Sequence, residues 1–191
     1  MRVIAGSAKG TTLAPVPPGV RPVSDRAREG LFSSLAAELE GARVLDLFAG
    51  SGALAIEALS RGAAGAVLVE RDPRTVAAIR DNLDRTRLGA RARVVRSPVE
   101  RYLEGAQREG PFDLVFLDPP YAAGSDEIAA ALRRLVAGTV LAEGATVVLT
   151  RDSRSSNDVI PVDWLVLKRL TYGDSVVTLC RPREQPRTTE E

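Results

Sequence analysis

Short apolar runs alternate with amphipathic segments through the middle of the chain. The apolar runs predict strands at 43–48, 66–70, 92–97, 112–117 and 145–150. Apolar residues at helical spacing predict helices between them, at 52–61, 73–88, 99–108 and 125–136. This alternation is typical of a parallel, doubly wound α/β sheet, which binds ligands beyond the carboxyl ends of its strands.

The two ends of the chain add different elements. Ser24 or Asp25 can cap a helix that runs to about Glu40. Near the other end, apolar runs at 163–169 and 175–181 flank a Tyr-Gly-Asp turn and predict an antiparallel hairpin. We therefore expect a mostly parallel seven-stranded sheet that ends in an antiparallel C-terminal hairpin.

The chain is expected to divide into three parts. Residues 1–23 predict a small basic β-hairpin arm and a Pro-rich linker. The main domain is expected over residues 24–182. Residues 183–191 are polar, and a disordered tail is expected there.

A glycine-rich turn follows the first strand of the alternating region. Gly50-Ser51-Gly52 lies between that strand and a helix, where glycines allow a tight turn and the close approach of a ligand. Glu70 ends the next strand, 20 residues after Gly50, which suits an acceptor for ribose hydroxyls. Together these features predict a site for an adenosine-containing ligand.

Asp46 helps to decide between two adenosine-containing ligands, a dinucleotide and S-adenosylmethionine. The Gly-x-Gly-x-x-Ala spacing also fits a dinucleotide, but a carboxylate just before the glycines would repel a pyrophosphate. An ammonium group and a sulfonium are better neighbours, so we expect S-adenosylmethionine. The residues expected to bind it are Asp46, Phe48, Ala49, Gly50, Ser51, Gly52, Glu70, Arg71 and Ser97.

The strand at 112–117 ends in Asp118-Pro119-Pro120-Tyr121. Two prolines cannot donate ladder hydrogen bonds, so the sheet must stop there in a rigid turn. The turn presents a carboxylate, free carbonyls and an aromatic face, which suit a planar base that carries an amino group. The alternative is a Pro-rich strand exit with Tyr121 packed in the core.

Composition narrows the chemistry. The 191 residues include no histidine, which excludes His-based triads, His general bases and His-containing zinc sites. We expect no bound metal. The sequence has no long apolar stretch and no charged-then-apolar leader, so we expect a cytoplasmic protein without a membrane span.

Positive charge gathers at the N-terminus of a chain whose net charge is +1. Residues 1–28 carry one acidic residue, Asp25, against these basic ones: Arg2, Lys9, Arg21, Arg26 and Arg28. We expect these side chains to bind RNA phosphates. The alternatives are a solvated arm without a partner and, for Arg26 and Arg28, salt bridges with Asp25 or Glu29.

Three segments in this order resemble the RsmD family of bacterial 16S ribosomal RNA guanine-N2 methyltransferases. They are the basic region with Arg-Pro-Val-Ser-Asp-Arg-Ala-Arg-Glu at 21–29, the glycine segment 46–52 and the Asp-Pro-Pro-Tyr segment 118–121. The resemblance covers residues 1–181. It implies a Rossmann-like methyltransferase fold, S-adenosylmethionine as cofactor, and 16S rRNA as substrate, within a small-subunit particle.

By the same resemblance, Gly50, Ser51 and Gly52 line the cofactor pocket, Glu70 holds the ribose, and residues 118–121 hold the target base. One position departs from the family pattern, because Pro98 stands where an acidic residue near the cofactor adenine is common. Ser97 or a backbone group is expected to take that place.

Other functions share parts of this pattern. A DNA adenine-N6 or cytosine-N4 methyltransferase has both central motifs but usually needs a separate target-recognition domain. A protein-glutamine methyltransferase normally presents Asn rather than Asp before Pro-Pro-Tyr. A non-enzymatic RNA- or nucleotide-binding module would not need an intact Asp118. We expect a monomeric enzyme.

Overall fold

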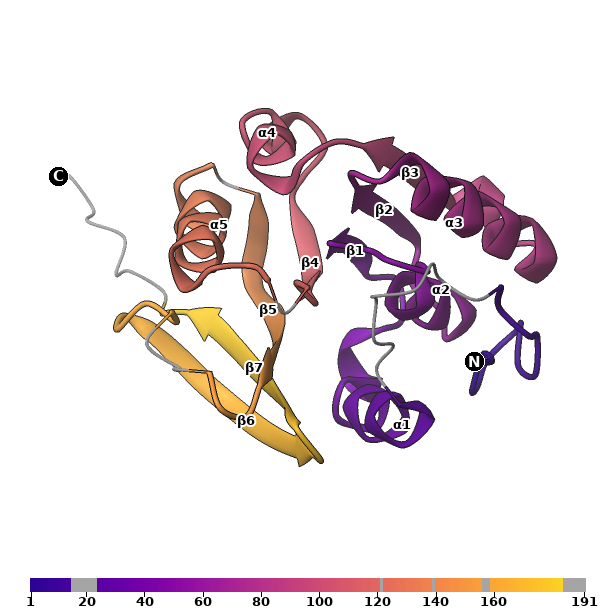
Figure 1. Cartoon of the computed structure of the whole chain (residues 1–191), viewed down its shortest axis with the longest axis horizontal. Coiled ribbons are helices and arrows are strands. Elements are labelled where there is room, and N and C mark those ends of the chain that lie inside the picture. Colours follow the sequence, from indigo (N-terminus) through magenta and orange to yellow (C-terminus); the bar gives the residue numbers. More distant parts are fainter. Residues whose placement is uncertain (15–23, 121, 139, 156–158, 184–191) are drawn as a thin grey trace, which may run out of the picture.

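A computed structural model of the chain describes residues 1–14, 24–120, 122–138, 140–155 and 159–183 (Figure 1). Its strands are β1 (Arg43–Leu47), β2 (Gly65–Glu70), β3 (Ala92–Arg96), β4 (Phe112–Leu117), β5 (Leu141–Asp152), β6 (Trp164–Tyr172) and β7 (Ser175–Pro182). Its α-helices are α1 (Asp25–Ser34), α2 (Ala53–Ser60), α3 (Pro73–Thr86), α4 (Val99–Leu103) and α5 (Ser125–Ala137). Among the described residues, no helix is long and apolar enough to cross a membrane.

The strands form one seven-stranded sheet in the order β3-β2-β1-β4-β5-β7-β6. β1 to β5 pair in parallel, and β7 pairs antiparallel with both β5 and β6. The predicted fold class is therefore confirmed, including the C-terminal hairpin. Chain order runs outward from β1 to β3 and returns to place β4 on the other side of β1, so a ligand crevice is expected at the carboxyl ends of β1 and β4.

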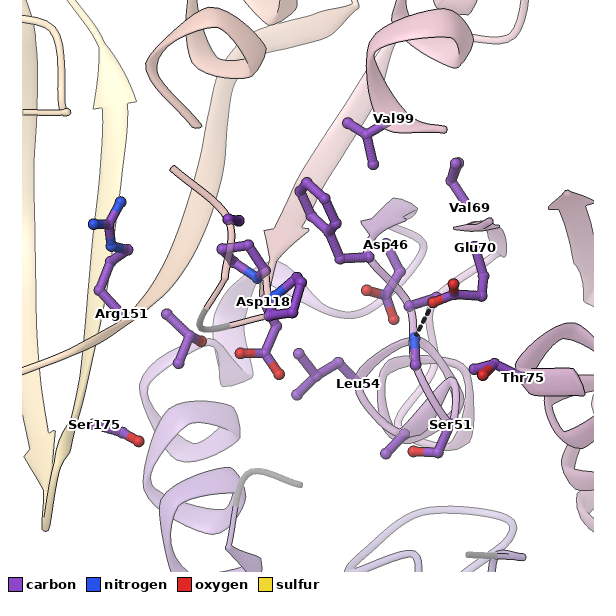
Figure 2. Close-up of a pocket in the computed structure, with 18 of the residues that line it drawn as sticks. Asp46, Ser51, Leu54, Val69, Glu70, Thr75, Val99, Asp118, Arg151 and Ser175 are labelled. Carbon is purple, nitrogen blue, oxygen red and sulfur yellow. Dashed lines mark hydrogen bonds between the residues drawn. The ribbon is translucent and has the colours of Figure 1, made fainter. Parts of the chain in front are cut away.

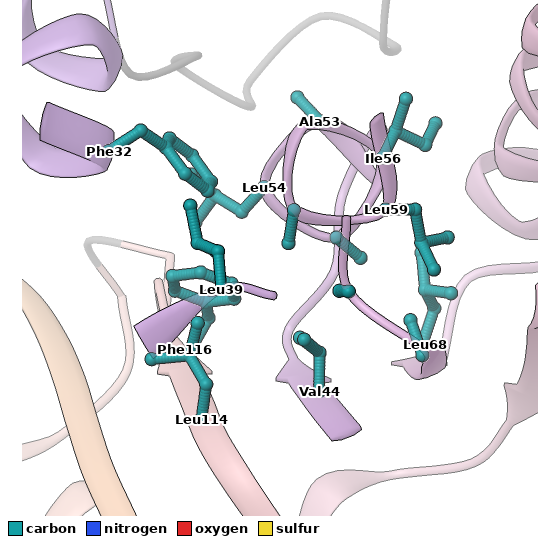
Figure 3. Packing of buried hydrophobic residues seen from close by; sticks show 14 of the residues in the cluster. Phe32, Leu39, Val44, Ala53, Leu54, Ile56, Leu59, Leu68, Leu114 and Phe116 are labelled. Carbon is teal, nitrogen blue, oxygen red and sulfur yellow. The ribbon is translucent and has the colours of Figure 1, made fainter. Parts of the chain in front are cut away.

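Helices cover both faces of the sheet, and each face has its own apolar core. α1, α2 and α3 pack on one face, where Phe32 of α1 meets Phe116 of β4 with ring centroids 5.9 Å apart. Figure 3 shows Leu54 and Ile56 of α2 in the same cluster. α4 and α5 pack on the opposite face. Apolar strand residues are buried on both sides, as the near-continuous apolar runs require.

Some predicted boundaries were wrong. The first helix ends at Ser34 instead of Glu40 and is followed by a 3₁₀ turn at Ala36–Glu38. The helix predicted at 99–108 ends at Leu103, just before Gly105, because glycine disfavours a helix interior. β5 begins before the predicted strand, and an irregular register with β4 accommodates Gly144 at φ +72°.

The N-terminal segment, defined here as residues 1–14, forms a single antiparallel bridge between Arg2 and Thr12 instead of a regular strand pair. Ser24 caps α1 as predicted, because its hydroxyl accepts a hydrogen bond from the Ala27 amide at 3.2 Å. Residues 15–23 and 184–191 lie outside the described residues, so the predicted linker, tail and three-part division stay predictions.

Candidate active site

A pocket of about 540 Å³ opens at the carboxyl ends of the parallel strands. The loops after all five parallel strands, β1 to β5, line it, and so do the start of α1 and the turn between β6 and β7. Figure 2 shows residues from opposite sides of this pocket, with Asp46 and Glu70 on one side and Asp118 and Arg151 on the other. The sheet therefore gathers most of the predicted site residues in one place.

The cofactor turn, defined here as Ala49–Gly52, leads from β1 into α2. Gly50 and Gly52 adopt left-handed conformations with φ +55° and +75°, and the Gly52 amide donates to the Ala49 carbonyl at 2.7 Å. A Cβ on Gly52 would lie 3.0 Å from Leu68 and 3.3 Å from Ile79. Glycine is therefore needed at position 52 both for the backbone and for the close packing of the turn on the core.

Glu70 ties this turn to the end of β2. Its Oε2 accepts a hydrogen bond from the Gly50 amide at 3.1 Å, which Figure 2 marks, and its Oε1 accepts one from the Asp72 amide at 2.9 Å. Each carboxylate oxygen accepts more than one hydrogen bond. Glu70 can therefore orient the turn and still accept hydrogen bonds from the hydroxyl groups of a ribose.

Asp46 is only 1% exposed, just before the turn. The pKa of its carboxyl group is raised to about 8, chiefly by burial and to a smaller extent by the nearby Asp118 and Glu70, although a hydrogen bond from the Ala55 amide at 3.2 Å acts to lower it. A positively charged ligand group would offset this burial. The buried carboxyl group thus fits the ammonium and sulfonium of S-adenosylmethionine. The glycines allow the protein backbone to approach this cofactor closely.

Asp118 stands at the end of β4, which pairs directly with β1. The pKa of its carboxyl group is raised to about 6, because the effect of burial outweighs that of a hydrogen bond with the Thr150 side chain, which acts to lower it. Pro119 and Pro120 line the same pocket. A base held at Asp118 would therefore lie next to a cofactor held by Asp46 and the cofactor turn. Tyr121 lies outside the described residues.

The structure places most predicted cofactor residues on the pocket wall. The lining includes Asp46, Phe48, Ala49, Gly50, Ser51, Glu70, Arg71 and Ser97. Gly52 lies behind the wall as the cap of α2. Near Pro98, the lining contains Ser97, which was expected there, and also Glu100 from the first turn of α4.

The predicted RNA-binding residues fall into two groups. Arg2, Lys9 and Arg26 are exposed. Arg28 is 1% exposed and donates to Asp25 at 2.7 Å, the alternative role considered above. We therefore leave Arg28 out of the proposed RNA surface. Arg21 lies outside the described residues.

Sequence reasoning missed two parts of the wall. Thr150 ends the predicted strand at 145–150 and Arg151 follows it, so the rule that ligands bind at the carboxyl ends of strands would have found them. The start of α1 was expected near the site through Arg26 and Arg28, and Arg28 does line the pocket, whereas the β6–β7 turn around Tyr172 carried no local signal. They reach the pocket only because β6 and α1 pack together, where the Tyr172 hydroxyl leaves no room for a Cβ on Gly30.

Doubly wound topology, a glycine turn, an acidic residue at the end of β2 and the Asp-Pro-Pro segment after β4 together define an S-adenosylmethionine-dependent methyltransferase. The family model described as Conserved hypothetical protein 95 matches residues 1–181. The chain is 37% identical over 187 residues to ribosomal RNA small subunit methyltransferase D of Escherichia coli, covering 97% of this chain and 91% of that protein. The chain belongs to this RsmD family.

Other similar proteins and solved structures support membership of this family. The Bacillus subtilis protein YlbH is 36% identical over 185 residues, which cover 96% of this chain and all of YlbH. Among solved structures, Escherichia coli yhhF has a TM-score of 0.83 at 36% identity and covers 97% of this chain and 99% of that chain. A hypothetical protein of a Thermus species has a TM-score of 0.79 at 38% identity, with 94% and 98% covered.

Proposed function

We propose that the protein transfers a methyl group from S-adenosylmethionine to the exocyclic N2 amino group of a guanine in 16S rRNA. The observation that carries this proposal is that Asp118 and Pro119 line the same pocket as the cofactor turn, at the ends of the neighbouring strands β4 and β1. Small-subunit rRNA is proposed as the substrate because relatives that match nearly the whole chain are named ribosomal RNA small subunit methyltransferase D.

The cofactor supplies an electrophilic methyl group on a sulfonium. The chain's own residues bind and orient the cofactor. Asp46 faces the ammonium, Glu70 accepts hydrogen bonds from the ribose hydroxyls, and the cofactor turn lets the cofactor approach the protein backbone closely. Because the pKa of Asp46 is raised to about 8, its carboxyl group is mostly protonated at neutral pH without the cofactor, and the positive charge of the ammonium favours loss of this proton when the cofactor binds.

Asp118 acts on the nucleophile. The N2 lone pair of guanine is delocalised into the ring, so the amino group is a poor nucleophile. The Asp118 carboxylate and the Pro119 carbonyl accept its two N–H hydrogens and leave the lone pair directed at the methyl group. With the pKa of Asp118 near 6, the carboxylate is mostly ionised at neutral pH and can accept these hydrogen bonds.

Tyr121 is proposed to stack on the base, a contact worth about 1–3 kcal/mol. A base inside a helix cannot reach a pocket at the sheet edge, so the target guanine must be unpaired or flipped out. Arg2, Lys9 and Arg26, which are exposed, are proposed to contact RNA phosphates. We propose a monomeric enzyme that acts on a small-subunit particle.

The test is to incubate the protein with labelled S-adenosylmethionine and, separately, with small subunits, naked 16S rRNA and DNA. We expect label in the rRNA of the subunits, in N2-methylguanosine after digestion to nucleosides. Label in adenine or cytosine of DNA would establish the alternative enzyme class. Label in no substrate despite measurable cofactor binding would refute the transfer reaction.

A further inference from the structure

The N-terminal segment is packed against the domain. Leu13 is 2% exposed and belongs to the same apolar cluster as α2 and α3. The amides of Ile4 and Ala5 donate to the two carboxylate oxygens of Glu57, at 2.8 Å and 3.0 Å, and Glu57 is fully buried in α2. Figure 1 shows the segment, in indigo, beside α2. The segment is therefore part of the wall that supports the cofactor site.

Asn82 of α3 joins this segment to the cofactor turn. Its side chain is fully buried. Its Oδ1 accepts a hydrogen bond from the Ala14 amide at 2.6 Å, and its Nδ2 donates to the Ser51 carbonyl at 3.0 Å. One side-chain amide thus connects two segments that are 68 and 31 positions from it along the chain.

The hydrogen bond to Ser51 matters because of where Ser51 lies. It stands between two glycines with positive φ, where the backbone has many alternative conformations. Asn82 sits among apolar residues of α3 such as Ile79 and Leu83, so an amide atom that loses its partner there is left buried and unpaired. The amide is therefore best satisfied when the segment and the turn are both in place.

We propose that Asn82 is a positioning residue that couples docking of the N-terminal segment to cofactor affinity. Docking of the segment favours the turn conformation that receives S-adenosylmethionine. Because linkage is reciprocal, cofactor binding in turn holds the segment more firmly. This inference rests on the assigned cofactor, and it makes residues 1–14 part of the cofactor site although, apart from Met1, they do not line the pocket.

The first test measures S-adenosylmethionine affinity by calorimetry. Asn82→Ala removes both hydrogen bonds and should weaken binding about tenfold. Ala14→Pro removes only the amide donor of the segment and should weaken binding about threefold. In the double variant the effects should not add, because both act through one amide. Thr86→Ala is the matched control. Thr86 is a buried polar residue one turn further along α3, and its hydroxyl donates to the backbone carbonyls of Asn82 and Leu83 but makes no hydrogen bond with the Asn82 side chain.

The main measurement of the second test uses the unaltered protein, and the Asn82→Ala variant serves only as a comparison. Hydrogen exchange over residues 1–14 should slow when S-adenosylmethionine is added, and this protection should be absent in Asn82→Ala. The proposed coupling would be overturned if Ala14→Pro bound S-adenosylmethionine as tightly as the wild type. It would also be overturned if hydrogen exchange over residues 1–14 did not change when the cofactor was added. Failure of the unaltered protein to bind S-adenosylmethionine at all would instead refute the cofactor assignment.

Discussion

Replacing Asp46 by asparagine should raise the stability of the folded protein and lower its affinity for the cofactor. Burial raises the pKa of the Asp46 carboxyl from 3.8 to about 8 in the folded protein. The folded state therefore binds this proton more tightly than the unfolded chain does. The stability that this group contributes is present below pH 4 and is lost as the pH rises to about 8.

The magnitude follows from the same shift. One pKa unit corresponds to about 1.4 kcal/mol, so ionised Asp46 opposes folding by on the order of 5 kcal/mol at pH 8 and much less at pH 5. Asparagine cannot ionise, and its side-chain oxygen can still accept the Ala55 amide. The stability advantage of Asp46→Asn without cofactor should therefore widen by about 4 kcal/mol between pH 5 and pH 8.

The assay is urea denaturation of both proteins across this pH range, with calorimetry for the cofactor. We expect cofactor affinity to fall at least tenfold in Asp46→Asn, because the ammonium loses its charged partner. Asp84→Asn is the matched control, since Asp84 lies on the exposed face of α3. A variant less stable than wild type at pH 8, with an unchanged pH dependence, would refute the reasoning.

Three further predictions follow from the site. Asp118→Ala should keep cofactor affinity and lose about a hundredfold or more in turnover. The wild-type rate should fall as the pH drops through about 6, where the carboxylate is protonated; near-normal methylation by the variant, or a rate that is flat across pH 6, would contradict the role. At Tyr121, Ala should be much worse than Phe in turnover on subunits, and equal loss would implicate the hydroxyl. Replacing exposed Arg2 and Lys9 with Gln should lower the salt dependence of RNA binding by roughly 0.7–0.9 in slope per lost phosphate contact, and an unchanged slope would exclude both residues from the interface.

Sequence reasoning succeeded where residues impose their own backbone. The glycines at 50 and 52 adopt the left-handed conformations that a tight turn needs, and the prolines at 119 and 120 end β4 as predicted. It failed at helix ends, which depend on the whole fold. Leu35 and Leu39 continue a helical pattern, yet α1 stops at Ser34 and a 3₁₀ turn carries both side chains into the core.

The sequence by itself determined the order of elements, the class of fold and the residues at the carboxyl ends of β1, β2 and β4, because periodicity, glycine and proline act over a few positions. Only the tertiary structure decided how Asp46 titrates, that Arg28 is buried and paired, and that Asn82 holds Ala14 and Ser51 together. These properties arise from burial and from contacts between residues far apart in the chain, which no local pattern encodes.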